Sequence, residues 1–265
     1  MSSVWYCIPS KRPPEEAGPV LREWRERGYK IALQVDGEGD RVEWLLGDGT
    51  QTQGFWHRQY RGYAEAVNFL ATQALQDKEC EWIVTGGDDV LPDPNKTAEE
   101  IARECSEYFA NAMLKEALAL WSSVASVRLA EDYSTFGVMQ PTGDRDWGDH
   151  RGPYCDFVAG SPWMGREWCL RANQGKGPLW PNFYHMFVDE HLQEMATKLG
   201  VFWQRQDLIH KHMNWGRPTK PVQRIVNVEE MPAFLTRANS TEEWYRGKQE
   251  LIRLRNTGFA ECMPL

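Results

Sequence analysis

The sequence lacks any apolar run of the roughly 18 to 20 residues that a membrane-spanning helix requires, and its N-terminus has no signal-peptide pattern. Both absences predict a protein of the cytoplasm that makes no membrane contact. Its six cysteines are scattered without a C-x-x-C pair. This spacing argues against a zinc knot and favours reduced, mostly buried thiols, to which we assign no chemistry.

Motifs that mark several enzyme classes are missing as well. The sequence contains no G-x-x-x-x-G-K-[ST] phosphate loop, no G-x-G-x-x-G fingerprint, no G-x-S-x-G elbow and no H-x-E with P-C-x-x-C. Absence of the phosphate loop argues against P-loop NTPases, and absence of the glycine fingerprint argues against dinucleotide oxidoreductases. Without the serine elbow and the zinc-binding motif, α/β-hydrolases and zinc deaminases are disfavoured as well.

Positive charge is also in deficit, since the formal net charge is −8 at pH 7. This argues against a protein that coats nucleic acid, because Lys and Arg drive phosphate binding. The deficit is uneven: positions 201–265 hold ten basic and seven acidic residues, and the preceding part holds the other 20 basic and 31 acidic ones. A locally basic surface is therefore compatible with the composition. The 13 tryptophans, many for this length, suit either core packing or stacking on rings.

Apolar segments in the first 95 residues alternate between strand and helix patterns. Their order of strand, helix, strand, helix, strand predicts an α/β fold with a parallel, doubly wound sheet flanked by helices. Ligands of such sheets bind at the carboxyl ends of the strands. Helical spacing also predicts a helix in the C-terminal tail. The expected strands lie in 3–10, 30–36 and 81–89, and the first two helices in 13–29 and 62–75.

Two adjacent aspartates, Asp88 and Asp89, end the third of these strands. Neighbouring carboxylates repel each other and resist burial, so a cation beside them would stabilise the arrangement. Their hard oxygen atoms suit Mg²⁺ or Mn²⁺, and such an ion neutralises a bound diphosphate. A turn or helix N-cap is the other interpretation, because Gly86, Gly87 and the following prolines favour turns.

Two histidines, His210 and His212, lie two positions apart in a late expected strand. Side chains with this spacing point to the same side of a strand. Imidazole suits Mn²⁺, so one of them is a candidate for completing a carboxylate and histidine site. Ordinary core or surface histidines are the alternative.

Two acidic residues, Asp189 and Glu190, open the predicted helix DEHLQEMATKLG. The helix dipole stabilises negative charge at this end, so capping is one interpretation. The other is a general base, kept ionised by the helix amides, that accepts a proton from an acceptor hydroxyl.

Basic and aromatic residues on two loops complete the set of candidates. Lys11 and Arg12 follow the first strand, where they would meet phosphate or a base edge. Trp163 and Arg166 lie on a turn shaped by Gly and Pro, which suits stacking and anion contact near an acceptor.

These features together resemble a metal-dependent glycosyltransferase of the GT-A fold. Longer strings are similar to a group of glycosyltransferases encoded by tailed bacteriophages: TGGDDVLPDP, FGVMQPTGDRDW, AGSPWMGREW, GKGPLWPNFYHMFVDEHLQE and LGVFWQRQDLIHKHMNWGR. The resemblance covers most of the chain, 110–134 looks like an enlargement, and the acidic motif reads Gly-Asp-Asp instead of Asp-x-Asp. It implies one GT-A domain over 1–265, with a nucleotide-sugar half in 1–95, an acceptor and catalytic half in 135–225, and an extension in 226–265.

The resemblance implies a metal site. Asp89, with Asp88 beside it, would hold Mn²⁺ or Mg²⁺ on the diphosphate of a nucleotide sugar, most often a UDP-sugar. His212 would be the third ligand, and His210 its substitute.

It also implies roles around the metal. Asp189, next to Glu190, would be the base of an inverting displacement, while Trp163 and Arg166 would face the acceptor. The nucleotide pocket would be lined by Pro9, Lys11, Arg12, Asp36, Tyr63, Asn68 and Asp88.

The implied acceptor is a hydroxymethylated pyrimidine in phage DNA. The segment 205–224 begins at Arg205, holds five basic residues and one acidic one, and has Trp203 just before it and Trp215 within it. It would track a phosphate backbone while a flipped base approaches Asp189. Trp215 and Arg217 are its candidate acceptor contacts. An ordinary solvated face is the alternative interpretation of this segment.

Three other functions stay open. The same chemistry would serve a glycan or protein acceptor. A sugar nucleotidyltransferase would need a phosphate loop rich in Gly, Lys and Arg after the first strand, which IPSKRPPEE matches only faintly. A sugar- or nucleic-acid-binding module without catalysis would use the tryptophans and would not need Asp189.

Overall fold

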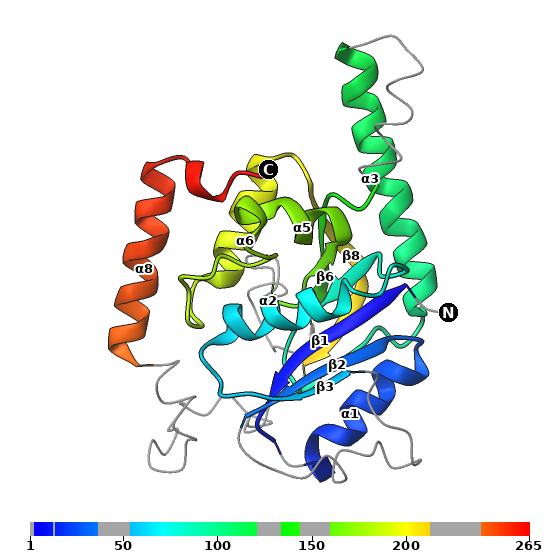
Figure 1. Cartoon of the computed structure of the whole chain (residues 1–265). Helices are drawn as coiled ribbons and strands as arrows, with labels where there is room; N and C mark the ends of the chain where they lie inside the picture. The colour runs from blue at the N-terminus through cyan, green and yellow to red at the C-terminus, as the bar shows by residue number, and fades with distance from the viewer. Residues whose placement is uncertain (1–2, 13, 37–53, 121–133, 144–159, 213–239) are drawn as a thin grey trace, which may run out of the picture.

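The apolar segments of the first 95 residues form the parallel half of one mixed sheet, as predicted (Figure 1). In this computed structural model, β1 lies between β2 and β4, β2 also pairs with β3, and all three pairings are parallel. The carboxyl ends of β1 and β2 therefore meet at one edge. The elements are β1 (Val4–Ser10), α1 (Pro14–Glu26), β2 (Lys30–Val35), β3 (Gly54–His57), α2 (Tyr63–Ala74) and β4 (Trp82–Val84).

Antiparallel strands enter in the second half of the sheet. β7 pairs antiparallel with both β4 and β6, β6 pairs parallel with β8, and β8 pairs antiparallel with β5. The strand order is β3-β2-β1-β4-β7-β6-β8-β5. The remaining elements are β5 (Val90–Leu91), α3 (Ala98–Leu120), β6 (Val138–Gly143), β7 (Trp163–Gly165), α5 (Arg166–Gly175), α6 (Val188–Lys198), β8 (Phe202–His212), α8 (Thr241–Asn256) and the short 3₁₀ helix η4 (Ala260–Cys262).

The structure describes residues 3–12, 14–36, 54–120, 134–143, 160–212 and 240–265, without the side chains of 113–120, 142–143 and 212. None of the helices in these ranges is long and apolar enough to cross a membrane.

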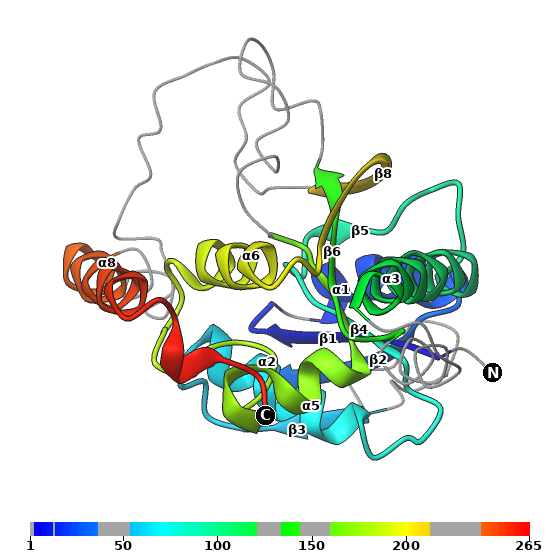
Figure 2. The ribbon, with the colours of Figure 1, turned by 90° about the horizontal axis from the view of Figure 1, so that it is seen from above.

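Helices α1 and α3 cover one face of the sheet (Figure 2). The ring of Tyr6 on β1 stacks on Trp24 of α1, with 3.8 Å between the ring centroids. Trp82 of β4 packs against Phe109 of α3. Both tryptophans are fully buried, so they serve the core.

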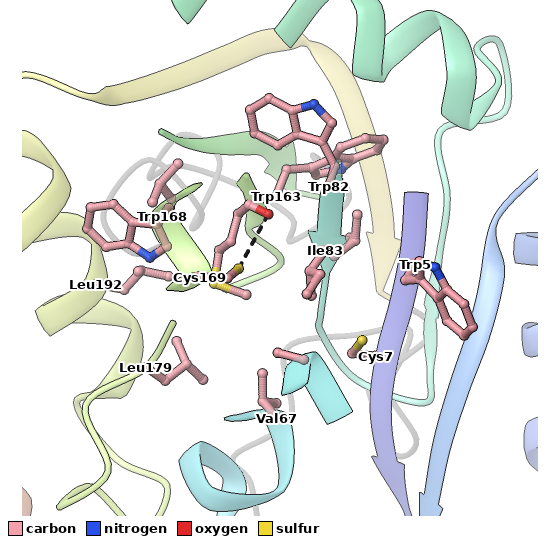
Figure 3. Close-up of a cluster of buried hydrophobic side chains, with 14 of the residues drawn as sticks. Trp5, Cys7, Val67, Trp82, Ile83, Trp163, Trp168, Cys169, Leu179 and Leu192 are labelled. Carbon is pink, nitrogen blue, oxygen red and sulfur yellow. Dashed lines mark hydrogen bonds between the residues drawn. The ribbon is translucent and has the colours of Figure 1, made fainter. Parts of the chain in front are cut away.

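Helices α2, α5 and α6 contribute to a second buried layer (Figure 3). Val67 of α2, Trp168 of α5 and Leu192 of α6 lie around Ile83 of β4. The cysteine prediction is confirmed where it can be followed: the five cysteines in the described ranges are free and buried. Cys155 lies outside those ranges.

The C-terminal helix α8 lies beside α6 (Figures 1 and 2), so the helix predicted for the tail is confirmed. Leu251 and Leu254 are buried, and Trp244 packs against Phe187 just before α6. Ser240 caps the helix by accepting a hydrogen bond from the Glu243 amide. The tail thus braces the start of α6.

Candidate active site

Asp88 and Asp89 lie in the turn after β4, at the edge where β1 and β2 also end. Two β1 side chains that share a face hold this turn. The Tyr6 hydroxyl donates to the Gly87 carbonyl oxygen at 2.8 Å, and the Ser10 hydroxyl donates to Asp88 Oδ2 at 2.5 Å. The turn is therefore fixed against the first strand.

The two carboxylates share one cation, the guanidinium of Arg12. Its Nε lies 3.0 Å from Asp88 Oδ1, and its Nη2 lies 3.0 Å from Asp89 Oδ2. The Arg12 amide also donates to Ser10 Oγ at 3.2 Å. Positive charge thus offsets the repulsion that the sequence pattern implies.

Burial raises the pKa of Asp88 above its ordinary value. The Ser10 hydrogen bond and the Arg12 charge act in the opposite direction, while the negative charge of Asp89 adds to the rise in the Asp88 pKa. The ionised form therefore depends on a cation close by.

The donor set fits a divalent ion of the Mg²⁺ or Mn²⁺ class. Two hard carboxylate groups already converge on a positive group, and Arg12 stands in for the ion. Among the described side chains, no three His, Cys, Asp or Glu residues cluster closely enough to hold a metal. Further ligands would have to come from a substrate diphosphate or from a side chain that the structure does not describe.

His210 is buried in the core, and its role as substitute metal ligand stays a prediction. Its Nδ1 lies 2.7 Å from Ser161 Oγ, its ring meets Trp24 edge-on, and it does not join the aspartates in a three-ligand cluster. Burial lowers the pKa of His210 to about 3. It is a neutral core histidine that ties β8 to the loop before β7.

His212 lies next to the acidic pair in backbone register. In the antiparallel pairing of β5 and β8 it is opposite Val90, the residue that follows Asp89. Its side chain is not among those described, so its role as third ligand stays a prediction.

Helix α6 is joined to the same region through α2. Gly62, with φ of 128°, precedes α2 and has no room for a side chain, because a Cβ there would lie 2.9 Å from the Tyr184 backbone oxygen. The Tyr63 amide donates to that oxygen at 2.5 Å. The Tyr63 hydroxyl lies 2.9 Å from Thr85 Oγ1 and donates to the Gly86 carbonyl at 3.3 Å. Tyr63 therefore connects the segment before α6 with the turn before Asp88.

Asp189 and Glu190 occupy the first turn of α6. Burial raises the pKa of both, and repulsion from Asp189 helps to bring the pKa of Glu190 to about 7. The charge of Asp189 also contributes to the raised pKa of Tyr63, behind burial, which places Asp189 within electrostatic reach of that tyrosine. A carboxylate pair that gains and loses a proton near neutral pH suits general base catalysis. The capping interpretation has support as well, because each carboxylate accepts a backbone hydrogen bond from its own residue.

Several predicted pocket residues gather at this edge of the sheet. Pro9 pairs with Gln34 near the ends of β1 and β2. Asp36 follows β2, accepts a hydrogen bond from the Tyr60 amide at 3.0 Å, and has Lys11 Nζ 3.9 Å from its Oδ2. With Arg12, Tyr63 and Asp88, these residues surround one edge.

The predicted nucleotide contact of Asn68 needs correction. Its Nδ2 donates to the Leu179 carbonyl at 2.8 Å, and its Oδ1 accepts from the Leu179 amide at 3.0 Å. The whole amide group is used to hold the loop before α6, so Asn68 is structural.

The predicted acceptor contacts of Trp163 and Arg166 also need correction. Trp163 is fully buried and meets Tyr29 edge-on, so its ring has no face to offer an acceptor. The Arg166 guanidinium donates to the backbone carbonyls of Leu75, Asp77 and Cys80. Trp215 and Arg217 lie outside the described residues, so their role stays a prediction.

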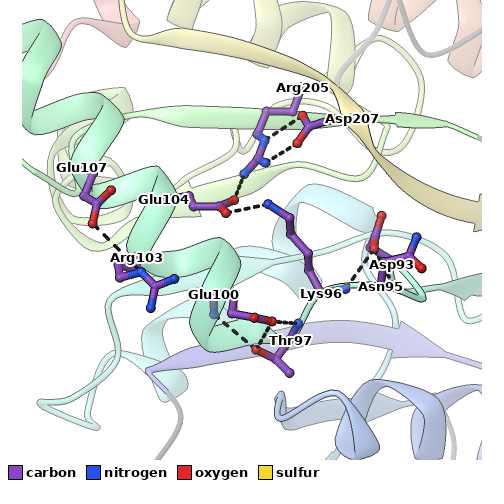
Figure 4. Close-up of polar contacts among 10 residues, drawn as sticks. All are labelled: Asp93, Asn95, Lys96, Thr97, Glu100, Arg103, Glu104, Glu107, Arg205 and Asp207. Atoms are coloured by element: carbon purple, nitrogen blue, oxygen red, sulfur yellow. Dashed lines mark hydrogen bonds and ion pairs between the residues drawn. The ribbon is translucent and has the colours of Figure 1, made fainter.

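Arg205, which opens the basic segment, is committed to an internal network (Figure 4). Only 4% of its side chain is exposed, and it donates to Glu104 at 2.6 Å and to Asp207 at 2.5 Å. Trp203 stacks on Tyr108 at 3.9 Å. The Arg205 side chain is therefore not available to a phosphate backbone, while the role of Trp203 stays a prediction.

The structure adds three residues that the sequence pattern did not single out: Tyr6, Ser10 and Ser161. Alternation along β1 is the signal for the first two, since positions four apart face the same side of a strand. No such signal marks Ser161, because its partners, His210 and the Thr85 carbonyl, are distant in the sequence and come close only in the folded chain.

Comparisons with known proteins gave structural likenesses alone. No protein-family model matches the chain, and no curated protein matches it. TarS from S. aureus in complex with UDP has a TM-score of 0.47 at 10% identity, over 80% of this chain and 60% of that chain. A putative glucose-1-phosphate thymidylyltransferase from Bacillus anthracis has a TM-score of 0.42 at 11% identity, over 80% of this chain and 88% of that chain. A putative nucleotide-diphospho-sugar transferase from Desulfovibrio desulfuricans has a TM-score of 0.38 at 12% identity, over 97% of this chain and 98% of that chain. Because all three TM-scores lie below 0.5, the proposal of a function rests on the site and on the sequence.

Proposed function

We propose that the protein is a metal-dependent glycosyltransferase that moves a sugar from a nucleotide sugar, a UDP-sugar being the first choice, to a hydroxyl group. One observation carries this proposal. Asp88 and Asp89 share a cation at the carboxyl ends of the strands, and Tyr63 connects their turn with the segment before α6, whose first turn carries two carboxylates with raised pKa values. The sequence resemblance to GT-A glycosyltransferases supports the donor class.

On the donor side, Asp88 and Asp89 would hold Mn²⁺ or Mg²⁺, with His212 as third ligand. The metal, when bound, would supply a Lewis acid for the leaving diphosphate. Pro9, Lys11 and Asp36 would bind the nucleoside, because they lie at the ends of β1 and β2 beside the acidic pair. Strand ends of this kind are the usual ligand sites of α/β sheets.

On the acceptor side, Asp189 would take the proton from the attacking hydroxyl, with Glu190 tuning its pKa. The first turn of α6 suits this role because the helix amides favour the ionised carboxylate. The Tyr63 hydroxyl bonds Thr85 and Gly86, which precede Asp88 in the chain. Tyr63 would therefore hold the base in a fixed position relative to the donor site.

A hydroxymethylated pyrimidine in phage DNA is the proposed acceptor, modified in the cytoplasm of the host cell. Support comes from the phage-type sequence strings and from basic and aromatic residues, Trp215 and Arg217 among them, that follow β8. A glycan or protein acceptor would use the same donor site.

The decisive experiment is a turnover assay with Mn²⁺, a panel of nucleotide sugars, and DNA with or without hydroxymethylated pyrimidines. We expect release of nucleoside diphosphate together with a mass gain on the base. Diphosphate release that never depends on DNA would reject the DNA acceptor. No metal-stimulated release with any pair of substrates would reject the transferase, and pyrophosphate formation from a sugar phosphate would indicate a nucleotidyltransferase.

Two variants test the division of labour. Asp89→Asn should lose metal-dependent nucleotide binding. Asp189→Asn should keep binding and lose turnover by roughly 10²- to 10⁴-fold, the usual contribution of a general base. Glu99→Gln, an exposed acidic residue in the first turn of α3, is the matched control and should change neither property. Equal loss of binding in both aspartate variants would refute the assignment.

A further inference from the structure

The guanidinium of Arg12 occupies the point on which the two aspartates converge. Its contacts to Asp88 Oδ1 and Asp89 Oδ2 are both 3.0 Å, and no more than 22% of any of the three side chains is exposed. Charge-assisted contacts of this length are strong where water is largely excluded. Arg12 is thus the resident counter-ion of the acidic pair.

A divalent metal and Arg12 cannot use these oxygen atoms together. The second oxygen of Asp88 already accepts the Ser10 hydroxyl at 2.5 Å, which leaves Oδ1 as its metal-facing oxygen. That oxygen is the one that Arg12 Nε contacts. Two cations within about 4 Å of each other repel, so metal binding requires the guanidinium to leave.

The local structure allows the side chain to leave while its backbone stays. Ser10 Oγ accepts the Arg12 amide at 3.2 Å and at the same time donates to Asp88, so the end of β1 is tied to the turn independently of the guanidinium. A diphosphate bound through the metal would bring new negative oxygens to the same place. Guanidinium groups bind phosphate through two parallel N–H donors, so Arg12 would have a new partner within reach.

We propose that Arg12 is an exchangeable counter-ion: it neutralises Asp88 and Asp89 in the absence of donor, and passes to the diphosphate when metal and nucleotide bind. The inference rests on the proposed donor site. It predicts that metal alone binds weakly, because it must displace Arg12 without compensation. Metal and nucleoside diphosphate should therefore strengthen each other's binding, with a coupling of about 5- to 150-fold.

The test is equilibrium Mn²⁺ binding, followed by the free-Mn²⁺ paramagnetic resonance signal, with and without UDP. Arg12→Gln should bind Mn²⁺ alone more tightly than wild type, by about the coupling factor. UDP should strengthen Mn²⁺ binding by that factor in wild type and by much less in Arg12→Gln. Arg12→Lys keeps the competing charge, so its affinity for Mn²⁺ alone should stay near the wild-type value.

Arg171→Gln is the control, because it removes an arginine that pairs with Glu167 at 2.7 Å on α5 and should leave Mn²⁺ binding unchanged. An Arg12→Gln protein that binds Mn²⁺ no more tightly than wild type would overturn the proposal. If that variant does not fold, wild type decides, since Mn²⁺ affinity that is indifferent to UDP would overturn it equally. Tighter Mn²⁺ binding in Arg12→Gln, together with a wild-type protein that turns over no donor, would leave the exchange standing and reject the transferase.

Discussion

At the scale of single residues, the site separates its carboxylates into two electrostatic environments. Asp88 and Asp89 share the positive charge of Arg12. Burial raises the pKa of both Asp189 and Glu190, and repulsion from Asp189 raises the pKa of Glu190 further. Environments that divide titratable groups in this way suit different tasks. We propose cation binding for the first pair and proton transfer for the second.

Glu190→Gln should move the acid limb of the kcat/KM profile to lower pH. Asp189 repels Glu190 and helps to raise the pKa of Glu190. The same repulsion acts on Asp189 whenever Glu190 is ionised, so removing the Glu190 charge should lower the pKa of Asp189. A base with a lower pKa becomes ionised, and active, at lower pH. The profile would be measured from about pH 5 to 9.

Glu242→Gln, in the first turn of α8, is the control and should leave this profile unchanged. A shift of the acid limb to higher pH, or an unshifted limb, would contradict the pairing of Asp189 with Glu190.

The sequence predicts a site residue well when its position depends on nearby residues, and poorly when its hydrogen-bond partners are distant in the sequence. Asp36, Asp88 and Asp89 follow apolar strands, and this position alone brings them to one edge of a parallel sheet. Asn68 and Arg166 satisfy backbone groups about 90 to 110 positions away, and no local pattern shows which partners the fold supplies. A polar residue near a predicted site is therefore ambiguous until its long-range hydrogen bonds are known.

At the scale of elements, the position of α6 depends on the loop that precedes it. Asn68 of α2 bonds both backbone groups of Leu179, and the Tyr63 amide bonds the Tyr184 carbonyl. Gly177 lies against the same side chain, and a Cβ there would come within 2.6 Å of Asn68 Cγ. The loop is therefore fitted to α2 at several points before α6 carries Asp189.

Asn68→Ala should destabilise the fold by about 2 kcal/mol, because two buried backbone groups of Leu179 lose their hydrogen bonds. The free energy of unfolding in urea would measure this loss. Nucleotide affinity of the folded variant should be unchanged, since the amide group faces the loop. Asn182→Ala, which removes one exposed contact to Glu250, should change stability by less than about 0.5 kcal/mol. Weaker nucleotide binding at unchanged stability would restore the role that the sequence resemblance assigned to Asn68.

The strands in the second half of the sheet are those that sequence patterns do not predict well. β5 has two residues, Val90 and Leu91, too few to show an alternation. Its pairing with β8 joins positions about 120 residues apart, and this pairing is what brings His212 opposite Val90. The βαβ pattern predicts the parallel half because each strand lies beside its near neighbour in sequence, whereas the mixed half depends on distant pairings.

At the scale of the whole molecule, much of the basic charge of the C-terminal part is paired with acidic side chains where the structure describes it, although only Arg205 is buried. Four of its arginines form ion pairs with acidic residues, and one of these pairs joins α3 to β8 (Figure 4). Arg205 is therefore withdrawn from any surface that binds DNA, whereas the other three arginines stay at the surface. The four arginines are Arg205, Arg246, Arg253 and Arg255.

Arg205→Met should destabilise the fold by about 3 kcal/mol, the low end of the range for breaking a buried ion pair, because Glu104 and Asp207 keep partial contact with water. Urea unfolding would measure the change. Arg103→Met removes an exposed pair with Glu107 on α3, in which 63% and 66% of the two side chains are exposed, and should cost less than about 1 kcal/mol. If the protein binds DNA, the salt dependence of binding should be the same for folded Arg205→Met and wild type, because an internal arginine releases no counterions. A salt slope reduced by about one, with stability unchanged, would instead place Arg205 on a phosphate.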